Sequence, residues 1–542
     1  MDKRNAVIGL LSLLVLAPVL PPALPARAEP VTLSIIHTND FHARLDPVTI
    51  AGNRCRPVDA TEHKCFGGIA RIATEIEKLR VSQPHPLVVD AGDRFQGSLY
   101  YNYYKSAAIK PFFELLGYQA MTLGNHEFDD GPAELARFLT GLTVPVISAN
   151  VDASAEPALA GKFGATLILP GGDQRIGLIG LTTPSTATNS KAGPTVHFTD
   201  PVEAARAGVA KLHAEGVKRI IVLSHLGFTE DQKLAAAVDG LSVIVGGHSH
   251  TLIGGSNPRS VAQSPVVVNA ASGRPTLIVQ SYFAGIFLGF LQVTLDDDGV
   301  PTAWQGEPIL LADTIAEDPT AKAFVEALAK PLAEQNGKII GQAAVDLIGD
   351  ATHCRFGECN LGDLITDAMI ADTAGQQVQI AVTNGGGIRT GIPVGPVTLG
   401  QVLEVLPFAN TISTFKLSGA DLRAALENGV SRAENPGGDG TGRFPQVSGL
   451  RFTWDAAAPA GQRIVSIETR EPDGSYAPLD PARLYMVASM DFLRNGGDGY
   501  TVFRDKAIEA YDGGSLLSEA TANFITAKSP LKQAVEGRIT RK

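Results

Sequence analysis

The stretch VTLSIIHTNDFH, residues 31–42, indicates the architecture of the first half of the chain. Its aliphatic, β-branched beginning at 31–36 predicts a buried strand. The strand leads into Asp40 and His42, whose side chains can both bind a metal ion. In an extended segment the i, i+2 spacing places both side chains on one side. The stretch therefore predicts a strand that delivers two ligands to one site.

Four further segments repeat this pattern, because each ends a strand-like run with metal-capable side chains. They are Asp90-Ala91-Gly92-Asp93, Gly124-Asn125-His126-Glu127, Ser224-His225 and Gly246-Gly247-His248-Ser249-His250. Taken singly, each segment is more often a turn or a capped strand end. Five of them in order within one α/β pattern predict a single metal centre at the strand ends. The glycines among them allow close backbone approach.

The rest of the first half alternates strands with helices, which is typical of an α/β fold with a largely buried sheet. Strands are expected at 86–90, 219–223 and 242–246, with helices at 68–80 and 201–215. A helix at 318–335 opens with Asp318-Pro319, and Pro331 is expected to kink it or end it early. A second α/β unit follows. The predicted units are 29–315, a linker at 316–340, and 341–542.

The first 28 residues are predicted to be a signal peptide. A charged start at 2–4 precedes an apolar run at 6–20, and Ala26-Arg27-Ala28 matches a cleavage site before Glu29. The alternative is a membrane anchor, but the run is shorter than the roughly 20 apolar residues that a spanning helix needs. The C-terminus carries the basic pair Arg541-Lys542 and no apolar tail. We therefore expect a periplasmic or secreted protein with no membrane anchor after cleavage.

Composition and cysteine spacing limit the function classes. The chain has 542 residues, enough for two to four domains at roughly 100–200 residues each. Its net charge of −11 argues against a protein that coats nucleic acid. Four cysteines allow three pairings, and local closure favours Cys55–Cys65 and Cys354–Cys359. A zinc site is disfavoured because the spacings of ten and five are not those of zinc motifs.

Mixed histidine, carboxylate and amide ligands suit first-row divalent ions better than calcium. About seven ligands are too many for one tetrahedral ion and fit two. Two ions can activate a water and stabilise an in-line displacement at phosphorus. A carboxylate that touches both ions is required, and Asp93 is the natural candidate. The ions would also bring about four positive charges to an acidic protein, which favours a phosphorylated substrate.

These motifs resemble the calcineurin-like metallophosphoesterases. Over about residues 31–530 the chain resembles the secreted 5′-nucleotidase family, which includes bacterial periplasmic nucleotidase/UDP-sugar hydrolases and animal ecto-5′-nucleotidase. The resemblance implies an N-terminal four-layer αββα domain and a C-terminal α/β substrate-binding domain joined by a helix. It also implies two divalent ions, with zinc favoured and manganese, cobalt, magnesium or iron as alternatives.

The resemblance further assigns roles to individual residues of the first domain. One ion would be bound by Asp40, His42, Asp93 and His250, and the second by Asp93, Asn125, His225 and His248. His126 would stabilise the transition state, oriented by Asp129, rather than bind metal. Ala43 stands where the wider superfamily usually has glycine, a position expected to provide backbone room.

The remaining histidines are expected to have no ligand role. His37 is expected to be a hydrogen-bonded core residue or a residue behind the ligands. The others are expected to be surface or structural residues: His63, His85, His197, His213 and His353.

The second domain is predicted to select the substrate. A glycine turn at 384–389 follows a strand-like run at 378–382 and can bind phosphate, although three glycines in a row are also common in ordinary loops. Aromatic faces can sandwich a base, although a phenylalanine taken alone more often packs in a core. The resemblance implies that Phe408 and Phe492 stack the base, that Asn384 contacts it, that Arg355 and Arg389 contact phosphate or ribose, and that Asp498 binds the ribose hydroxyls. Gly386 belongs to the same pocket, and both cysteine pairs resemble disulfides of the animal enzyme.

The sequence thus predicts an exported dimetal phosphohydrolase acting on nucleoside 5′-monophosphates and extending to nucleotide diphosphates or UDP-sugars. The two domains would close by rotation about the linker, as in the family. Alternatives on the same fold are a 2′,3′-cyclic-nucleotide phosphodiesterase, an NAD or UDP-sugar pyrophosphatase and a thiosulfohydrolase. A non-catalytic nucleotide-binding surface protein is more remote, because every ligand position is filled. The expected partner is a nucleotide and not a nucleic acid, and the expected state is a monomer or weak dimer.

Overall fold

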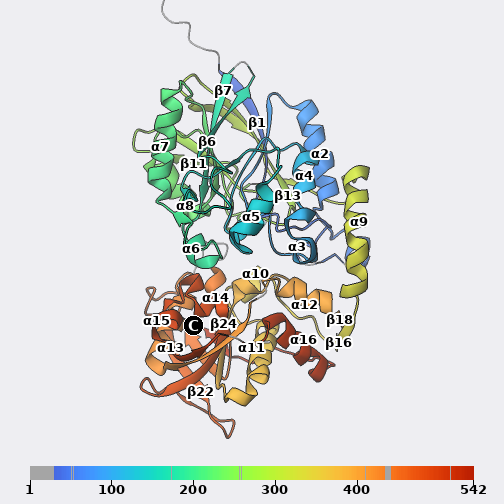
Figure 1. The fold of residues 1–542 in the computed structure, drawn as a ribbon, viewed down its shortest axis with the longest axis vertical. Coiled ribbons are helices and arrows are strands. Elements are labelled where there is room, and N and C mark those ends of the chain that lie inside the picture. The colour runs from blue at the N-terminus through green and yellow to red at the C-terminus, as the bar shows by residue number, and fades with distance from the viewer. Residues whose placement is uncertain are drawn as a thin grey trace, which may run out of the picture.

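The protein is described by a computed structural model covering residues 30–542 apart from 51, 53, 56, 173, 255, 256, 258, 409, 434–440 and 513. The signal peptide expected at 1–28 lies outside the described residues. Figure 1 shows two α/β domains arranged end to end, with the N-terminal domain above and the C-terminal domain below. The two-domain α/β architecture expected from the sequence is therefore confirmed.

The N-terminal domain contains two packed sheets. In the first, the strand order is β14 (Pro301–Gln305), β13 (Phe287–Leu295), β1 (Val31–Thr38), β2 (Pro86–Asp90), β3 (Ala120–Thr122) and β4 (Val146–Ile147), and β15 (Ile309–Leu310) also pairs with β13. In the second, the order is β11 (Val266–Asn269), β12 (Pro275–Val279), β10 (Val243–Val245), β9 (Ile220–His225), β7 (Gln174–Thr182) and β6 (Thr166–Gly171).

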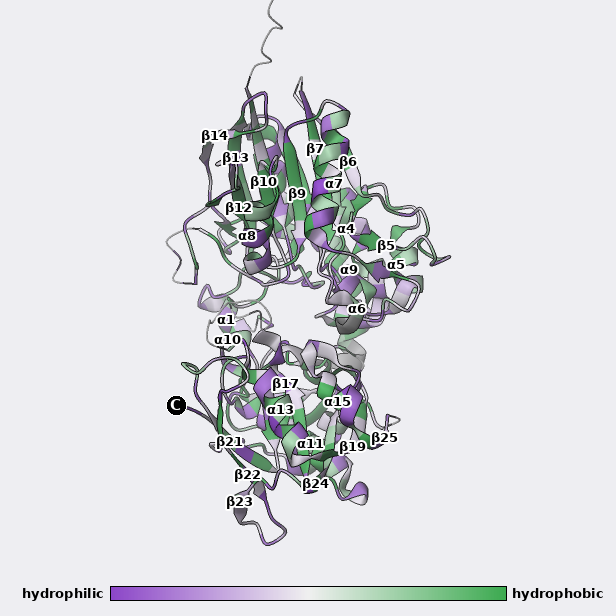
Figure 2. Ribbon diagram, turned by 90° about the vertical axis from the view of Figure 1, so that its left-hand side faces the viewer, coloured by the Kyte–Doolittle hydropathy of each residue, from purple (hydrophilic) through white to green (hydrophobic). Residues whose placement is uncertain are grey.

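Alternating side chains of β1 explain the layers of this domain. Leu33 and Ile35 belong to a core between the sheets, together with residues of β9 and β10. Ile36 points to the opposite face, where helices α2 (Ile69–Ser82), α4 (Lys110–Leu116) and α5 (Gly131–Leu139) pack. Helices α7 (Pro201–Ala214) and α8 (Phe228–Ala237) cover the far face of the second sheet. The order helix, sheet, sheet, helix is the expected four-layer αββα arrangement, and Figure 2 shows the buried strands β9 and β10 in the hydrophobic colour.

Parallel pairing brings the ends of the strands to one edge of each sheet. Thr38 of β1 lies opposite Asp90 of β2, and Asp90 lies opposite Met121 of β3. In the second sheet, Thr182 at the end of β7 lies opposite His225 at the end of β9. The loops that follow these strands therefore start side by side at the carboxyl ends, where ligands bind in open α/β sheets.

Helix α9 (Pro319–Asn336) connects the domains. Asp318 caps it by accepting a hydrogen bond from the Ala321 amide at 2.8 Å, and proline occupies its first turn, as the sequence predicted. The helix continues through Pro331 to Asn336, so the expectation that it ends early is wrong. It packs against α2 of the N-terminal domain and α12 (Leu399–Val405) of the C-terminal domain. Figure 1 shows it along one side of the molecule.

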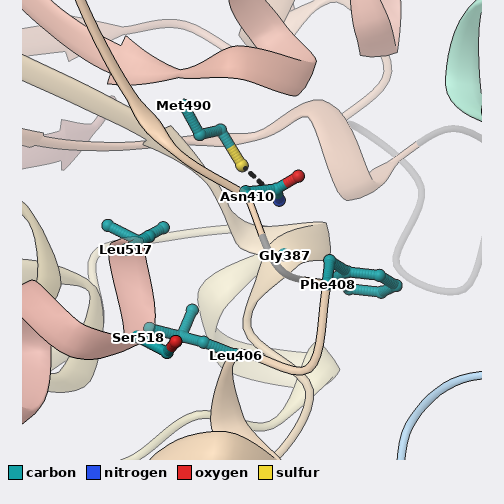
Figure 3. Close-up of a pocket in the computed structure, with 7 residues that line it drawn as sticks. All are labelled: Gly387, Leu406, Phe408, Asn410, Met490, Leu517 and Ser518. Carbon is teal, nitrogen blue, oxygen red and sulfur yellow. Dashed lines mark hydrogen bonds between the residues drawn. The ribbon is translucent and has the colours of Figure 1, made fainter. Parts of the chain in front are cut away.

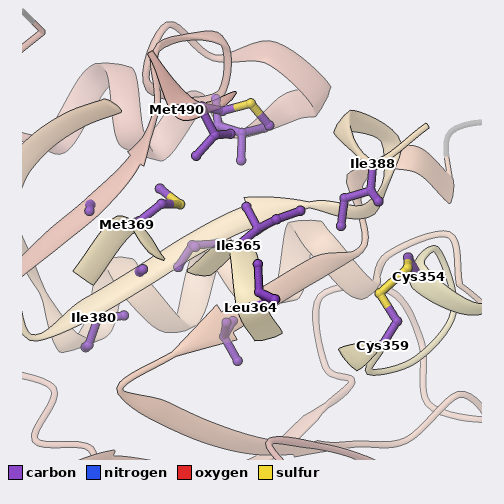
Figure 4. Close-up of a cluster of buried hydrophobic side chains, with 14 of the residues drawn as sticks. Cys354, Cys359, Leu364, Ile365, Met369, Ile380, Ile388 and Met490 are labelled. Atoms are coloured by element: carbon purple, nitrogen blue, oxygen red, sulfur yellow. A yellow bond between two sulfur atoms is a disulfide. The ribbon is translucent and has the colours of Figure 1, made fainter. Parts of the chain in front are cut away.

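The C-terminal domain has its own sheets and core. The larger sheet has the order β20 (Pro445–Ser448), β17 (Ile380–Asn384), β24 (Leu484–Met490), β19 (Ile412–Ser418) and β25 (Ile508–Tyr511). The smaller has the order β23 (Tyr476–Pro478), β22 (Ile464–Arg470), β21 (Leu450–Trp454) and β26 (Ile539–Arg541). Helices α11 (Asn360–Asp372), α13 (Gly419–Val430) and α16 (Leu517–Lys528) contribute to the core. Figure 4 shows part of that core, with Cys354 and Cys359 at one side.

Short elements complete the fold. The strands are β5 (Val151–Asp152), β8 (His197–Phe198), β16 (Ile339–Ala343) and β18 (Gly395–Thr398). The α-helices are α1 (Pro57–Thr61), α3 (Leu99–Tyr104), α6 (Thr186–Asn189), α10 (Ala351–Cys354), α14 (Asp491–Arg494) and α15 (Thr501–Lys506). The 3₁₀ turns are η1 (Lys105–Ala108), η2 (His126–Phe128), η3 (Ala374–Gln376), η4 (Gly385–Gly387), η5 (Thr441–Arg443) and η6 (Gly497–Gly499).

Two disulfides close local loops. Cys55 is joined to Cys65, and Cys354 is joined to Cys359, which are the pairs that local closure favours. Such bonds persist in oxidising compartments. Within the described part of the chain, no helix has the length and apolar character needed to cross a membrane.

Candidate active site

The loops after β1 and β2 are joined by backbone hydrogen bonds. The amide of Asp40 donates to the carbonyl of Gly92 at 2.9 Å, and that of His42 donates to the carbonyl of Asp93 at 3.0 Å. Asp40, His42 and Asp93 all have positive φ angles, of 49°, 52° and 58°. This left-handed conformation is unfavourable for residues with a Cβ, by roughly 1–3 kcal/mol each when the surroundings enforce it. The fold thus holds these three residues in an energetically unfavourable backbone conformation.

Side chains expected to bind metal converge in two adjoining groups. Asp40, His42 and His250 offer ligand atoms within 4.8 Å of one another, and so do Asp93, His225 and His248. The Nε2 atoms of His42 and His250 are 3.0 Å apart, and His225 Nε2 is 3.0 Å from Asp93 Oδ2. His225 Nε2 is also 4.0 Å from Asp40 Oδ1, so the groups adjoin. His225 is the last residue of β9, and the others lie in loops that follow strand ends.

Backbone acceptors fix the orientation of two of these histidines. His225 Nδ1 is 2.7 Å from the Ala91 carbonyl oxygen, and His42 Nδ1 is 3.3 Å from the Phe95 carbonyl oxygen. With Nδ1 donating, Nε2 is the unprotonated nitrogen and faces the site. Glycine makes room for His225, because a Cβ on Gly92 or on Gly247 would lie 2.9 Å from its Nδ1.

The residues fit a pair of divalent cations. The carboxylates of Asp40 and Asp93 are buried together, and buried anions need a compensating charge. Oδ1 of Asn125 is buried and has no hydrogen-bond partner among the described residues, so an amide oxygen is left for a ligand that is not part of the protein. Burial lowers the pKa of His248 to about 3 and lowers the pKa values of His42 and His250, which keeps these rings neutral. Neutral imidazole is the form that binds metal.

His126 lies beside the clusters. Its Nδ1 is 2.6 Å from Asp129 Oδ2, and its Nε2 is 3.9 Å from Asp93 Oδ2. Burial alone lowers the pKa of His126, but the charges of Asp129 and Asp93 outweigh it and raise the pKa above the usual value. His126 also lies within ligand distance of His42 and Asp93. The ring can therefore act as a proton donor or as a ligand, and only its effect on metal content separates the two roles.

A cavity of about 620 Å³ lies between the C-terminal domain and the candidate metal ligands of the N-terminal domain. Arg389 Nη2 lies 3.2 Å from His42 Nε2, and the ring of Phe408 stacks on His126 with centroids 5.4 Å apart. Asn384 donates to Asp498 Oδ2 at 2.5 Å. The cavity wall includes every residue of the second domain that the sequence proposed for substrate binding: Arg355, Asn384, Gly386, Arg389, Phe408, Phe492 and Asp498.

Phe408 does not pack in the core, which was the alternative for each phenylalanine. Figure 3 shows its ring directed away from Met490, Leu406 and Leu517, which line a small adjoining pocket. Phe492 packs partly against the core of its domain and also lines the large cavity. Both rings thus contribute to the wall of the large cavity.

Glu127 is a central residue of the site that the sequence did not single out. Its carboxylate accepts hydrogen bonds from the backbone amides of Asp93, Arg94, Phe95 and Gly124 at 2.6–3.2 Å. Burial raises its pKa to about 7, as does the charge of Asp93, and the backbone donors oppose this. Glu127 therefore joins the loops after β2 and β3. No spacing rule could reveal it, because its partners are backbone groups and three of the four belong to a loop 32–34 residues earlier in the sequence.

We expect Glu127→Gln to weaken metal binding by about 10- to 100-fold, the usual effect of losing a residue that supports ligands. Each carboxylate oxygen accepts from two backbone amides, so the amide NH₂ of glutamine would face two donors that need an acceptor. Metal titration followed by atomic absorption, with thermal unfolding, measures the effect. Glu134→Gln on α5 is the matched control, since Glu134 bonds the Ser106 amide and Arg137 away from the ligands. Equal metal binding by both variants would contradict the role of Glu127.

Asp90 is held away from the site although its motif offers two carboxylates. Arg94 Nη2 lies 2.8 Å from Asp90 Oδ2, and Thr38 donates to the same oxygen at 2.7 Å. The guanidinium also lies over the rings of Phe113 and Tyr118, with Arg94 Cζ at 4.5 and 4.6 Å from the centroids. Asp90 and Arg94 therefore form a buried support beneath the loop, and Asp93 alone faces the clusters.

His37 and Ala43 differ in part from expectation. His37 is buried in β1 against Gly289, but its Nδ1 has no hydrogen-bond partner within the described residues, so the expected hydrogen bond is absent at that atom. Burial lowers the pKa of His37 to about 3. Ala43 has φ 51°, so this position takes a left-handed backbone, which glycine adopts more readily than alanine.

Comparison with known proteins places this geometry in a family. Residues 33–252 match the model described as calcineurin-like phosphoesterase, and residues 339–505 match that of the 5′-nucleotidase C-terminal domain. The 5′-nucleotidase of Bos taurus is 37% identical over 534 residues, which cover 94% of this chain and 91% of the relative. The chain belongs to the 5′-nucleotidase family. It is therefore a metal-dependent phosphohydrolase.

Other 5′-nucleotidases extend the likeness over the whole chain. A snake venom 5′-nucleotidase from Naja atra is 37% identical, covering 94% of this chain and 98% of the relative. A crystal structure of a 5′-nucleotidase precursor from Thermus thermophilus has 44% identity and a TM-score of 0.87, covering 94% of this chain and 99% of that one. This 5′-nucleotidase family member thus shares its domain order and arrangement with solved relatives.

Proposed function

We propose that the protein releases phosphate from nucleoside 5′-monophosphates. The observation that carries the proposal is the lining of the large cavity. It joins Asp93, Asn125, His126 and two further histidines of the N-terminal domain to four arginines, two phenylalanines and Asp498 of the C-terminal domain. A nucleoside monophosphate requires both kinds of binding site: a cationic site for its phosphate, and an aromatic and polar site for its base and ribose.

The cations are assigned to the two clusters. One ion would be held by Asp40, His42, Asp93 and His250, and the other by Asp93, Asn125, His225 and His248. Zinc is favoured by the nitrogen-rich ligands, with manganese, cobalt, magnesium and iron as alternatives. When bound, the ions supply Lewis-acid activation of water and of the phosphate oxygens.

The protein's own residues then orient the substrate and move a proton. Arg389 reaches His42 across the domain boundary, so its guanidinium and that of Arg355 are placed to bind phosphate or ribose. His126, held by Asp129 at Nδ1, presents Nε2 to the site and donates a proton to the departing 5′-oxygen.

The remaining cavity residues form the proposed nucleoside-binding site. Phe408 and Phe492 would stack the base, worth about 1–3 kcal/mol per stacked base. Asn384 contacts the base and also holds Asp498, whose carboxylate suits the ribose hydroxyls. Asp498 is a non-glycine residue with φ 53°, a strained conformation typical of ligand-binding positions.

A substrate panel tests the proposal. The products formed from AMP, UDP-glucose, NAD and the cyclic AMP isomers are separated by chromatography and quantified together with released phosphate, each with and without a chelator. We expect AMP to be hydrolysed and a chelator to abolish turnover, with restoration by added divalent metal. Hydrolysis that resists the chelator would overturn the metal mechanism. Preference for cyclic nucleotides, UDP-glucose or NAD over AMP would instead select one of the alternative reactions on this fold.

We further propose that the domains move apart for substrate entry and close for turnover. The contact of Arg389 with His42, and of Phe408 with His126, describes a closed arrangement that surrounds the phosphate. Domain closure around a ligand uses hinge residues near a linker, here the region 316–340 beside α9.

A reversible cross-link tests this movement. Asn102 on α3 donates to the carbonyl of Leu403 on α12 at 3.4 Å, so Asn102→Cys with Leu403→Cys places two thiols across the domain boundary. All four natural cysteines are disulfide-bonded, which leaves the new pair as the reactive thiols. We expect oxidation to reduce turnover to a small fraction, and mild reduction to restore it. The single Asn102→Cys variant is the control, and full activity in the locked form would contradict the proposal.

The cellular setting completes the proposal. An exported protein agrees with the two disulfides and with the predicted cleavage before Glu29. We propose that the protein is periplasmic or secreted and that it is a monomer or weak dimer. We also propose that its two domains span 29–315 and 341–542, with a linker at 316–340. Mass spectrometry of the exported protein tests the cleavage site, and light scattering tests the oligomeric state.

A further inference from the structure

A short segment after β7 touches three parts of the active site. At its start, the Thr183 amide donates to the carbonyl of His225 at 3.0 Å, beside a proposed metal ligand. Its middle forms helix α6, which packs against η6, the turn that carries Asp498. In Figure 1, α6 lies at the lower edge of the N-terminal domain, facing the C-terminal domain. The segment 183–190 is thus held from both domains.

The segment ends at Ser190, whose hydroxyl reaches the carboxylate behind His126. Ser190 Oγ donates to Asp129 Oδ1 at 2.7 Å, while Asp129 Oδ2 lies 2.6 Å from His126 Nδ1. Each oxygen of the carboxylate therefore has one partner, and the group is fixed in rotation by the two together. Ser190, Asp129 and His126 all line the cavity.

We propose that Ser190 is a positioning residue that keeps His126 aligned for proton transfer to the leaving oxygen. This inference rests on the proposed role of His126. The side chain of Asp129 is 11% exposed, so without the hydroxyl it can turn towards water in the cavity. A turned carboxylate lets the imidazole rotate, and small errors of alignment cost large factors in proton transfer.

The first test compares two leaving groups. Ser190→Ala is expected to lower kcat for AMP by about 10- to 100-fold, the range for a hydrogen bond to a charged group, with KM and metal content nearly unchanged. The loss with p-nitrophenyl phosphate should be much smaller, because nitrophenolate departs without a proton. Ser190→Thr keeps the hydroxyl and should restore most of the activity. Equal losses with both substrates, or no rescue by threonine, would overturn the proposal.

Thr195→Ala is the matched control for these variants. Thr195 lies on the same connection, and its hydroxyl donates to a carboxylate, that of Glu156 at 2.5 Å. Neither residue lines the cavity. Thr195→Ala should therefore keep the ratio of AMP to p-nitrophenyl phosphate turnover seen in the unmodified protein. A change of that ratio equal to the change in Ser190→Ala would show that any lost bond on the connection has this effect, and would overturn the specific role of Ser190.

A second test does not depend on turnover. A proton shared between His126 Nδ1 and Asp129 gives a far-downfield proton resonance, which is assigned by its absence in His126→Ala. The resonance should shift or broaden in Ser190→Ala and persist in Ser190→Thr. An unchanged resonance in Ser190→Ala would overturn the inference even if no nucleotide were hydrolysed. Failure of the unmodified protein to hydrolyse AMP would instead count against the proposed function.

Discussion

Asp93→Ala is expected to lower kcat/KM for AMP by at least about 10³-fold, more than the loss of a single transition-state donor. Asp93 is the carboxylate common to both proposed ion sites, and it lies within 3.0 Å of His225 Nε2 and 3.9 Å of His126 Nε2. It also accepts a hydrogen bond from the His126 amide at 2.9 Å. Its removal therefore disturbs both ions and the proton donor. Steady-state kinetics with metal analysis of the purified variant measures the loss.

Thermal unfolding gives an independent measure of the same variant. Ligands that bind only the folded state raise its stability, so added divalent metal should raise the Tm of the unmodified protein. Asp93→Ala should show a much smaller rise. Asp152→Ala is the control, because Asp152 is an exposed carboxylate that caps the Ser154 amide. A metal-dependent rise of normal size in Asp93→Ala would contradict a shared ligand.

His126→Ala is expected to lower kcat by about 10²- to 10⁴-fold, the range for a positioned proton donor, while the metal content remains nearly full. The expectation follows from the hydrogen bond between His126 and Asp129. It also follows because His126 is a member of neither of the two proposed ion sites, although it lies near His42 and Asp93. Kinetics with AMP and metal analysis after gel filtration provide the two readouts.

His225→Ala provides the contrast for this prediction. His225 is fully buried, its Nδ1 is fixed by the Ala91 carbonyl, and its Nε2 faces Asp93. We expect this variant to lose the metal itself together with activity. Since His126 is also within ligand distance of His42 and Asp93, equal metal loss in both variants would make His126 a ligand rather than a proton donor.

The sequence predicted those parts of the site that depend on strand ends. Parallel pairing brings together the strand ends that precede Asp-x-His and His-x-His. The expected extended alternation of these ligands is wrong, because they lie beyond the strands in a left-handed backbone. The fold class followed from the same alternation, and its four layers followed from the family resemblance. Side chains of the second domain were proposed from the resemblance, because single phenylalanines and glycine turns carry little information of their own.

The sequence could not predict the residues whose contacts depend on the conformation of a loop. Glu127 accepts four backbone amides, Arg94 holds Asp90 from beneath, and Ser190 reaches Asp129 from 61 residues away. Each depends on a loop conformation that exists only after folding. The path of α9 through Pro331 is a further case, because packing against α2 and α12 overrides a local preference for an early end.

The left-handed backbone of the site restricts any attempt to redesign its ion preference. Five proposed ligands, Asp40, His42, Asp93, His248 and His250, have φ between 49° and 72°. A designer who exchanges one of them must satisfy the backbone as well as the ion. Asparagine, aspartate and histidine tolerate this conformation better than most residues, whereas β-branched residues do not. Few substitutions are therefore compatible with the backbone at these positions. Exchanges among asparagine, aspartate and histidine, which all carry oxygen or nitrogen ligand atoms, offer the practical route to a different metal.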